Sequence, residues 1–304
     1  MIGGIWAAVL TPINEKLSPD VATAVPYYRE LLACGCDGIN VLGTTGEAMS
    51  FNGDQRIAFM ESIGASGLPM DRVMAGSGAA SLADSVRQTR AAFDCGFAAA
   101  LVMPPFFFRD SGDDGIAAFF DALLAQANPP QKGIVLYNFP RMSGITFHAS
   151  LVDRLVDEFP GIIAGMKDSS NDAQLQTKVL ARHPEFAMFP GSESGLLAAK
   201  ARGAMGCISG TVALWPEFAR SVFTNDAVTQ DKLLTKARAA LDGTALIPAM
   251  RHLTATLRND PAWERAMPPL TALAPAQQRD LDRRLAPFRS VTGLPRWDSD
   301  LRQV

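Results

Sequence analysis

The chain has 304 residues, enough for two domains of about 150 residues or for one large α/β barrel with an extension. Its 28 Lys and Arg nearly balance its 31 Asp and Glu, so the net charge of −3 offers no basic surface for nucleic acid and no polybasic membrane anchor. Hydrophobic residues make up 48% and charged residues only 19%, which excludes a disordered interaction protein.

The small numbers of cysteines and histidines limit the disulfides, metal sites and catalytic triads that the chain can form. Four cysteines without C-x2-C spacing predict a reduced, cytoplasmic chain with neither a disulfide framework nor a zinc site. Three widely separated histidines argue against a metal site rich in histidine and against a Ser-His-Asp triad. The apolar start of the chain is too short to span a membrane and lacks the basic residues of a signal peptide, so we expect a strand there.

Short apolar segments recur along the first two thirds of the chain, and longer segments with helical patterning separate them. The eight predicted strands are Ile5–Leu10, Gly38–Leu42, Arg72–Ala75, Phe97–Met103, Ile134–Phe139, Ile162–Met166, Phe186–Phe189 and Ala204–Ile208. They are apolar on both faces, as strands of a parallel sheet covered by helices are. The alternation predicts an α/β fold, a closed (β/α)8 TIM barrel. An open doubly wound sheet is the alternative, although no G-x-G-x-x-G motif follows the first strand.

The helical segments begin at small polar residues and often end at glycine, which are ordinary helix start and stop signals. The clearest predicted helices are Thr23–Ala33, Ala80–Cys95, Asp113–Ala127, Ser194–Arg202, Val228–Leu241, Ile247–Leu257 and Ala276–Ala286. No strand is predicted after residue 210, and no Gly/Ser linker divides the chain. We therefore predict a barrel over residues 1–223 and a helical domain over residues 224–304 that packs on it.

One lysine stands out at the predicted strand ends, where barrels of this type carry their active sites. Of the seven lysines, Lys167 alone terminates a buried apolar strand. Burial disfavours the charged form of an amine, and a neutral amine attacks a carbonyl carbon to form a Schiff base. The alternative is a structural lysine that pairs with Asp168 or with another carboxylate at the barrel rim.

Other strand ends carry groups that suit the same chemistry. Tyr137 is the one tyrosine on a predicted barrel strand. It either shuttles protons during catalysis or is an aromatic residue of the core. The turn Gly43–Glu47 offers hydroxyl and backbone donors to an anion, unless it merely caps a helix. Glycine-rich turns after the last two strands leave a flavin or sugar-phosphate enzyme open, although they hold no Lys or Arg. The apolar run Pro104–Phe108 predicts either a lid or a subunit contact.

Four motifs follow one another along the chain: Gly43-Thr44-Thr45-Gly46-Glu47, Tyr137-Asn138-Phe139-Pro140, Gly165-Met166-Lys167-Asp168 and Gly191-Ser192-Glu193. In this order and spacing they make the chain resemble the dihydrodipicolinate synthase / N-acetylneuraminate lyase superfamily, from Ile5 to the helical C-terminus. The resemblance implies a (β/α)8 barrel with a C-terminal helical domain in a homo-oligomer, a dimer or tetramer. It also implies Schiff-base chemistry on pyruvate or another 2-keto acid and an aldehyde, without a metal or an organic cofactor.

The resemblance assigns roles to residues of this sequence. Its implied catalytic positions are Lys167 as the Schiff-base lysine, Tyr137 as the proton relay and Thr45. Its implied substrate-binding positions are Thr44, Thr45 and Gly46 for the pyruvate carboxylate, Gly191 and Ile208 as pocket lining, and Phe107 and Met142 on the side of the second substrate.

The sequence departs from the family pattern at two of these positions. Dihydrodipicolinate synthases carry a tyrosine that reaches in from a neighbouring subunit to complete a relay through Thr45, and Phe107 stands in its place. They also carry an arginine that binds the carboxylate of the second substrate, and Met142 stands in its place, a loss of about 1.5–3 kcal/mol. Arg141 is adjacent, but on a predicted extended segment it points the other way.

These departures favour an aldolase of 2-keto sugar acids over a synthase that condenses pyruvate with aspartate semialdehyde. A non-catalytic protein that binds 2-keto acids on the same barrel is a further alternative.

Overall fold

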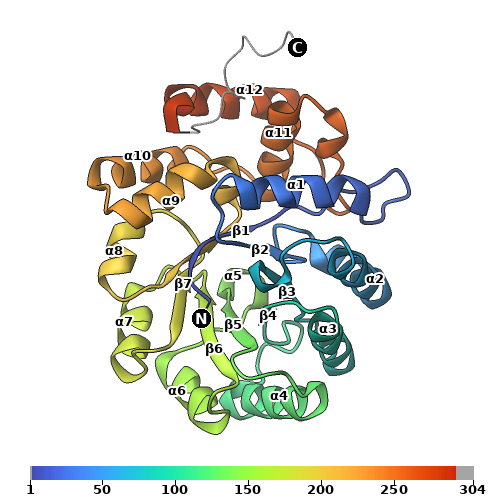
Figure 1. The fold of residues 1–304 in the computed structure, drawn as a ribbon, viewed down its shortest axis with the longest axis vertical. Helices are drawn as coiled ribbons and strands as arrows, with labels where there is room; N and C mark the ends of the chain where they lie inside the picture. The colour runs from blue at the N-terminus through green and yellow to red at the C-terminus, as the bar shows by residue number, and fades with distance from the viewer. Residues whose placement is uncertain (1, 292–304) are drawn as a thin grey trace.

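Eight parallel strands form a barrel within residues 2–291, the part of the chain that the computed structural model describes (Figure 1). The strands are β1 Gly4–Ala8, β2 Gly38–Val41, β3 Val73–Gly76, β4 Ala99–Val102, β5 Ile134–Asn138, β6 Ile163–Asp168, β7 Ala187–Pro190 and β8 Gly206–Ser209. Their hydrogen-bonded order is β7-β6-β5-β4-β3-β2-β1-β8, and the Met205 amide donates to the Met188 carbonyl where β7 and β8 meet. The predicted barrel is confirmed, and the open-sheet alternative is wrong because β1 lies beside β8.

Helices surround the barrel and continue beyond it. They are α1 Val21–Ala33, α2 Gly53–Gly64, α3 Leu82–Asp94, α4 Gly112–Ala127, α5 Pro140–Ser143, α6 Ala149–Glu158, α7 Ala173–Arg182, α8 Leu196–Ala201, α9 Pro216–Asn225, α10 Val228–Ala239, α11 Leu246–Arg258 and α12 Pro275–Leu285. Side-chain caps begin several of them: Asp20 accepts from the Thr23 amide, and Ser81 accepts from the Asp84 amide. None of these helices is long and apolar enough to cross a membrane.

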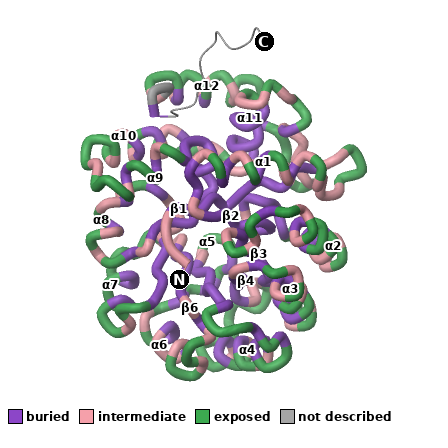
Figure 2. The backbone as a smooth tube through the Cα atoms, in the orientation of Figure 1, coloured by how far each residue is buried: buried purple, intermediate pink, exposed green. Residues whose placement is uncertain are grey.

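The apolar core has an inner and an outer layer because the strand side chains alternate between two faces. The inner layer fills the barrel with residues such as Trp6, Leu101 and Phe189. The outer layer joins the strands to the helices, and Figure 2 shows mostly buried strands at the centre, surrounded by helices that mix buried and exposed residues. Tyr137, Lys167 and Phe189 lie opposite one another on β5, β6 and β7, so all three belong to the inner layer.

The helices α10, α11 and α12 gather at one side of the barrel, next to α1 (Figure 1). Buried residues of α10, α11 and α12 pack with those of α1, β1 and β2 in one cluster, so this helical part shares its core with the barrel. The predicted division after residue 223 stays a prediction. Helix α9 runs across that position, and residues 292–304 of the predicted helical domain lie outside the described residues.

Candidate active site

Lys167 lies inside the barrel near the carboxyl end of β6, and 4% of its surface is exposed. Its Nζ lies 4.4 Å from the centroid of the Tyr137 ring. Within residues 2–291, the amino group has no hydrogen-bond partner and no ion pair. A buried amine without a competing partner is available to attack a carbonyl carbon.

Asp168 follows Lys167 but faces away from it, because neighbouring residues of a strand point to opposite faces. The Asp168 carboxylate accepts from Asn138 Nδ2 at 2.8 Å, from Ser170 Oγ at 2.6 Å and from Gln176 Nε2 at 2.9 Å. The alternative of a structural Lys167–Asp168 ion pair is therefore wrong. Asn138 and Asp168 instead join the ends of β5 and β6 and fix the spacing between Tyr137 and Lys167.

Tyr137 is brought together with two other predicted site residues. Its hydroxyl lies 3.3 Å from Thr44 Oγ1, and its ring stacks at a tilt on Phe139 with centroids 5.7 Å apart. The side chain is buried, and its ring borders the Lys167 amine. The arrangement places the Tyr137 ring beside the amine and the Thr44 hydroxyl beside the Tyr137 hydroxyl, which suits proton transfer.

The turn that carries Thr44 and Thr45 is packed tightly against the ends of β1 and β8. A Cβ at Gly210 would lie 2.7 Å from Thr45 Oγ1, and a Cβ at Gly46 would lie 2.9 Å from Thr11 Oγ1. Larger residues at both glycines would displace the turn. Thr45 is buried and Thr44 is half-buried, so the turn presents its hydroxyls from a rigid base.

Gly191 and Ile208 lie at the neighbouring strand ends. Ile208 is fully buried on β8 and shares the inner core layer with Tyr137. The Gly191 amide donates to the Asp168 carbonyl at 2.7 Å, and a Cβ at Gly191 would lie 2.0 Å from Ser169 Oγ. Only glycine fits this position, and the backbone therefore passes close to the end of β6.

The structure does not bring Phe107 and Met142 into this buried group. Phe107 is 75% exposed, its ring packs edge-on against Phe108, and Met142 is 47% exposed. The predicted extended segment at Arg141 and Met142 is wrong, because Pro140 begins the short helix α5. Consecutive residues of a helix differ by about 100° in direction, so Arg141 does not point opposite to Met142.

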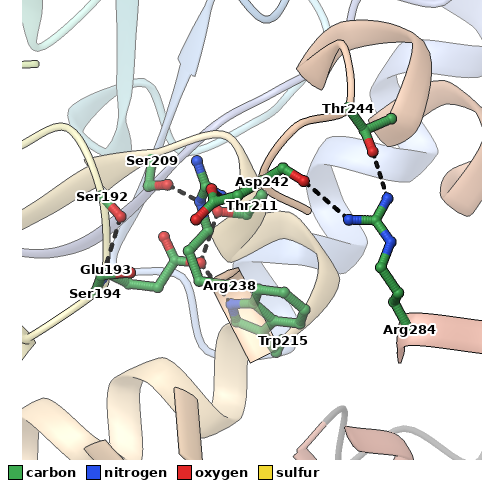
Figure 3. Close-up of polar contacts among 10 residues, drawn as sticks. All are labelled: Ser192, Glu193, Ser194, Ser209, Thr211, Trp215, Arg238, Asp242, Thr244 and Arg284. Atoms are coloured by element: carbon green, nitrogen blue, oxygen red, sulfur yellow. Dashed lines mark hydrogen bonds and ion pairs between the residues drawn. The ribbon is translucent and has the colours of Figure 1, made fainter. Parts of the chain in front are cut away.

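Glu193 belongs to a motif that the sequence marked, but sequence reasoning gave its side chain no role. Its buried Oε1 accepts from Thr211 Oγ1 at 2.7 Å and from Trp215 Nε1 at 2.8 Å (Figure 3). Its Oε2 is buried without a hydrogen-bond partner among the described residues. Ser209 Oγ lies 3.1 Å from Thr211 Oγ1, whose single proton goes to Glu193. Ser209 therefore donates to Thr211, and the lone pairs of its oxygen remain free to accept.

The buried thiols do not compete with Lys167 as nucleophiles. Burial, and then the charge of Asp37, raise the pKa of Cys36 to about 12. Burial, and then the charge of Glu193, raise the pKa of Cys207 well above its usual range. A thiol that stays protonated is a poor nucleophile. Within residues 2–291, no group of three or more His, Cys, Asp and Glu side chains is arranged to hold a metal ion.

A cavity of about 930 Å³ lies at the other end of the barrel. Gly3, Ala98 and Ala187 line it, and they precede or begin strands rather than end them. Barrel enzymes carry their catalytic groups at the carboxyl ends of the strands, so we assign the chemistry to the group around Lys167 and not to this cavity.

Comparisons with known proteins agree with the geometry. The model of the dihydrodipicolinate synthetase family matches residues 1–252. A relative described as an uncharacterised DapA-like lyase, from Chloroflexus aurantiacus, is 34% identical over 87% of this chain and 85% of its own. A 4-hydroxy-tetrahydrodipicolinate synthase from Synechococcus is 28% identical over 95% of this chain and 96% of its own. The crystal structure of dihydrodipicolinate synthase from Agrobacterium tumefaciens superposes with a TM-score of 0.89 at 28% identity, over 95% of this chain and 100% of the other.

Proposed function

Because the chain belongs to the dihydrodipicolinate synthetase family, we propose that Lys167 forms a Schiff base with pyruvate or a 2-keto-3-deoxy acid. The protein is a lyase of this family, whose enzymes use a lysine Schiff base and need no cofactor. The observation that carries the assignment to Lys167 is its buried amine without a partner, 4.4 Å from the Tyr137 ring.

The reaction begins when the Lys167 amine adds to the keto carbon. The carbinolamine then loses water to give an iminium ion, which accepts the electrons of the bond that breaks next. In the cleavage direction that bond lies between C3 and C4, and the products are an aldehyde and an enamine. Protonation of the enamine and hydrolysis release pyruvate and restore the free amine. Tyr137 supplies and removes the protons, and Thr44, whose Oγ1 lies 3.3 Å from the Tyr137 hydroxyl, extends the relay.

The turn after β2 is suited to the carboxylate of the keto acid. Hydroxyl groups and backbone N–H groups of Thr44, Thr45 and Gly46 are the kind of donors that hold a carboxylate next to a reacting centre. Gly191 follows β7 and Ile208 lies on β8, and we expect both to line the space beside the Lys167 amine. Fixed donors of this kind keep the keto carbon oriented toward the amine.

The substrate that these residues favour is a 2-keto acid of the sugar-acid type, cleaved in an aldolase reaction. Phe107 has no hydroxyl with which to complete a relay that begins at Tyr137 and Thr44. Met142 offers no cation to a second carboxylate, so a neutral, sugar-derived aldehyde suits the site better than aspartate semialdehyde.

The second candidate is 4-hydroxy-tetrahydrodipicolinate synthase, which condenses pyruvate with aspartate semialdehyde. Whole-chain similarity to proteins of that name supports it. The helical turn α5 also weakens one argument against it, since Arg141 is exposed on the same turn as Met142 and is not held on the opposite face.

The third candidate is a protein that binds a 2-keto acid without turnover, which the missing hydroxyl at Phe107 supports. It differs from the other two in one observable: the imine forms, but no aldehyde is consumed or released. A panel of 2-keto-3-deoxy acids and aspartate semialdehyde, assayed side by side for pyruvate release or consumption, separates the three candidates.

The covalent intermediate is tested by borohydride reduction in the presence of pyruvate. We expect one reduced adduct, which peptide mass spectrometry locates at Lys167 and which is absent from Lys167→Met. Lys178→Met is the control, because Lys178 is exposed on α7 and should leave the adduct unchanged. Wild-type protein that gives no adduct on Lys167 would falsify the proposal.

A further inference from the structure

Glu47 ends the turn that carries Thr44 and Thr45, and its side chain is fully buried. Both Nε and Nη2 of Arg251, a buried residue of α11, bind its Oε1. The Met267 amide donates to its Oε2 at 2.8 Å. Every partner of this carboxylate therefore comes from the chain beyond the barrel strands, more than 200 residues away in sequence.

Arg251 binds more than Glu47. Its Nη2 donates to the Thr11 carbonyl at 3.1 Å, and its Nη1 donates to the Trp263 carbonyl at 3.4 Å. Thr11 follows β1 and Glu47 follows β2, so one guanidinium joins two neighbouring strand ends to α11 and to the segment after it. Burial lowers the pKa of Arg251, and Glu47 counters that effect, as expected when a carboxylate compensates a buried cation.

The backbone of the turn also needs external support. Leu42 and Glu47 flank Gly43–Gly46 with φ of 52° and 54°, in the left-handed region that residues other than glycine rarely adopt. Such conformations persist only where the surroundings enforce them. The Glu47 amide donates to the Thr44 carbonyl at 3.0 Å, so the position of Glu47 sets the position of Thr44 directly.

We propose that Glu47 and Arg251 are positioning residues for the carboxylate of the keto acid, so that the C-terminal helices take part in substrate binding. The pair holds the turn where Thr44 Oγ1 lies 3.3 Å from the Tyr137 hydroxyl and where Thr45 packs on Gly210. The inference rests on the proposed role of Thr44 and Thr45, and it adds two residues that touch neither the substrate nor Lys167.

The test compares Arg251→Met and Glu47→Gln with a matched control on the same helix. Arg258 also ties α11 to the barrel, through an ion pair with Glu30 of α1, and within residues 2–291 its side chain makes no hydrogen bond or ion pair with Glu47 or Thr44. Arg258→Met therefore weakens the attachment of α11 and leaves Glu47 in place. Three quantities are measured for each variant: the melting temperature, the pyruvate concentration that gives half-maximal borohydride trapping on Lys167, and kcat and KM in the lyase assay.

We expect Arg251→Met and Glu47→Gln to raise the half-trapping concentration and the KM about tenfold, while kcat changes much less. The assays are run well below the melting temperature of every variant. Arg258→Met should lower the melting temperature and leave the half-trapping concentration unchanged. The double variant Glu47→Gln/Arg251→Met should melt at a higher temperature than Arg251→Met, because no buried charge is left uncompensated, yet keep the raised KM.

Two results would overturn the inference. One is a half-trapping concentration within twofold of wild type in folded Glu47→Gln or in folded double variant. The other is a half-trapping concentration that rises equally in Arg258→Met, because the rise would then follow from loss of stability and not from loss of the Glu47–Arg251 pair. Failure of the proposed function is a separate outcome, since wild-type protein would then give no adduct on Lys167.

Discussion

At the scale of single residues, the Tyr137 hydroxyl is the most informative group to remove. Tyr137→Phe keeps the ring beside Lys167 and deletes only the hydroxyl that faces Thr44. General acid–base catalysis contributes about 10²–10⁴-fold, so we expect kcat to fall by that factor while the imine with pyruvate still forms slowly. Stopped-flow trapping together with steady-state assays measures both quantities. An unchanged kcat would leave Tyr137 as a core aromatic residue only.

The hydrogen bond from Trp215 to the buried Glu193 carboxylate should contribute measurably to stability. Trp215→Phe removes the indole N–H that donates to Glu193 Oε1 at 2.8 Å and leaves that buried acceptor with one donor. We expect the free energy of unfolding to fall by about 1–3 kcal/mol more than in the control Trp263→Phe. Trp263 is also buried, but no hydrogen bond from its indole joins it to the described residues. Urea denaturation measures the difference, and equal losses in the two variants would contradict the expectation.

The sequence predicted the residues that gather around Lys167 because each ends a buried strand, and all such ends meet on one face of a barrel. It gave no role to Glu193 and Arg251. Arg251 meets Glu47 across 204 positions of sequence, and no local pattern marks a contact of that kind. Glu193 stands beside glycine and serine in an ordinary turn, and only its burial distinguishes it.

At the scale of elements, we predict that the apolar segment Pro104–Phe108 after β4 forms a contact between subunits. Phe107 and Phe108 are 75% and 73% exposed and pack on each other, an apolar surface that a second copy of the chain can cover. We expect Phe107→Asp/Phe108→Asp to lower the oligomeric state, because burying two carboxylates at a contact is unfavourable. Light scattering after gel filtration measures it. Leu17→Asp, at another exposed apolar residue, is the control. A double variant with the mass of wild type would favour the lid interpretation.

Strands were the most predictable elements, and short loops the least. A strand that is buried on both faces appears in the sequence as an uninterrupted apolar run, and all eight strands lie where such runs predicted them. The helical turn at Pro140–Ser143 was expected to be extended. Four residues are too few to show the periodic hydrophobic pattern of a helix. Whether such a short segment forms a helical turn depends on the residues that it packs against.

At the scale of the whole molecule, the thiols couple stability to pH. Burial raises the pKa of Cys36 from 9.0 to about 12, and burial also raises the pKa of Cys207. Above pH 9 the unfolded chain releases these protons while the folded chain keeps them. The folded state then binds more protons, and its stability falls as pH rises. The stabilisation that the protonated Cys36 thiol adds to the free energy of unfolding is therefore complete below about pH 9. It is lost progressively toward pH 12, at about 1.4 kcal/mol per pH unit.

The measurement is the free energy of unfolding in urea at a series of pH values between about 8 and 11. Cys36→Ala should be less stable than wild type near neutral pH, because it leaves a small cavity, but should lose less stability as pH rises. Val212→Ala is the control, since Val212 is fully buried and does not titrate, so it should be destabilised and keep the wild-type slope. Because Tyr27 and Tyr28 also have pKa values raised by burial, part of the slope should remain in Cys36→Ala. Equal slopes in Cys36→Ala and Val212→Ala would mean that the Cys36 thiol ionises as readily in the folded chain as in the unfolded one.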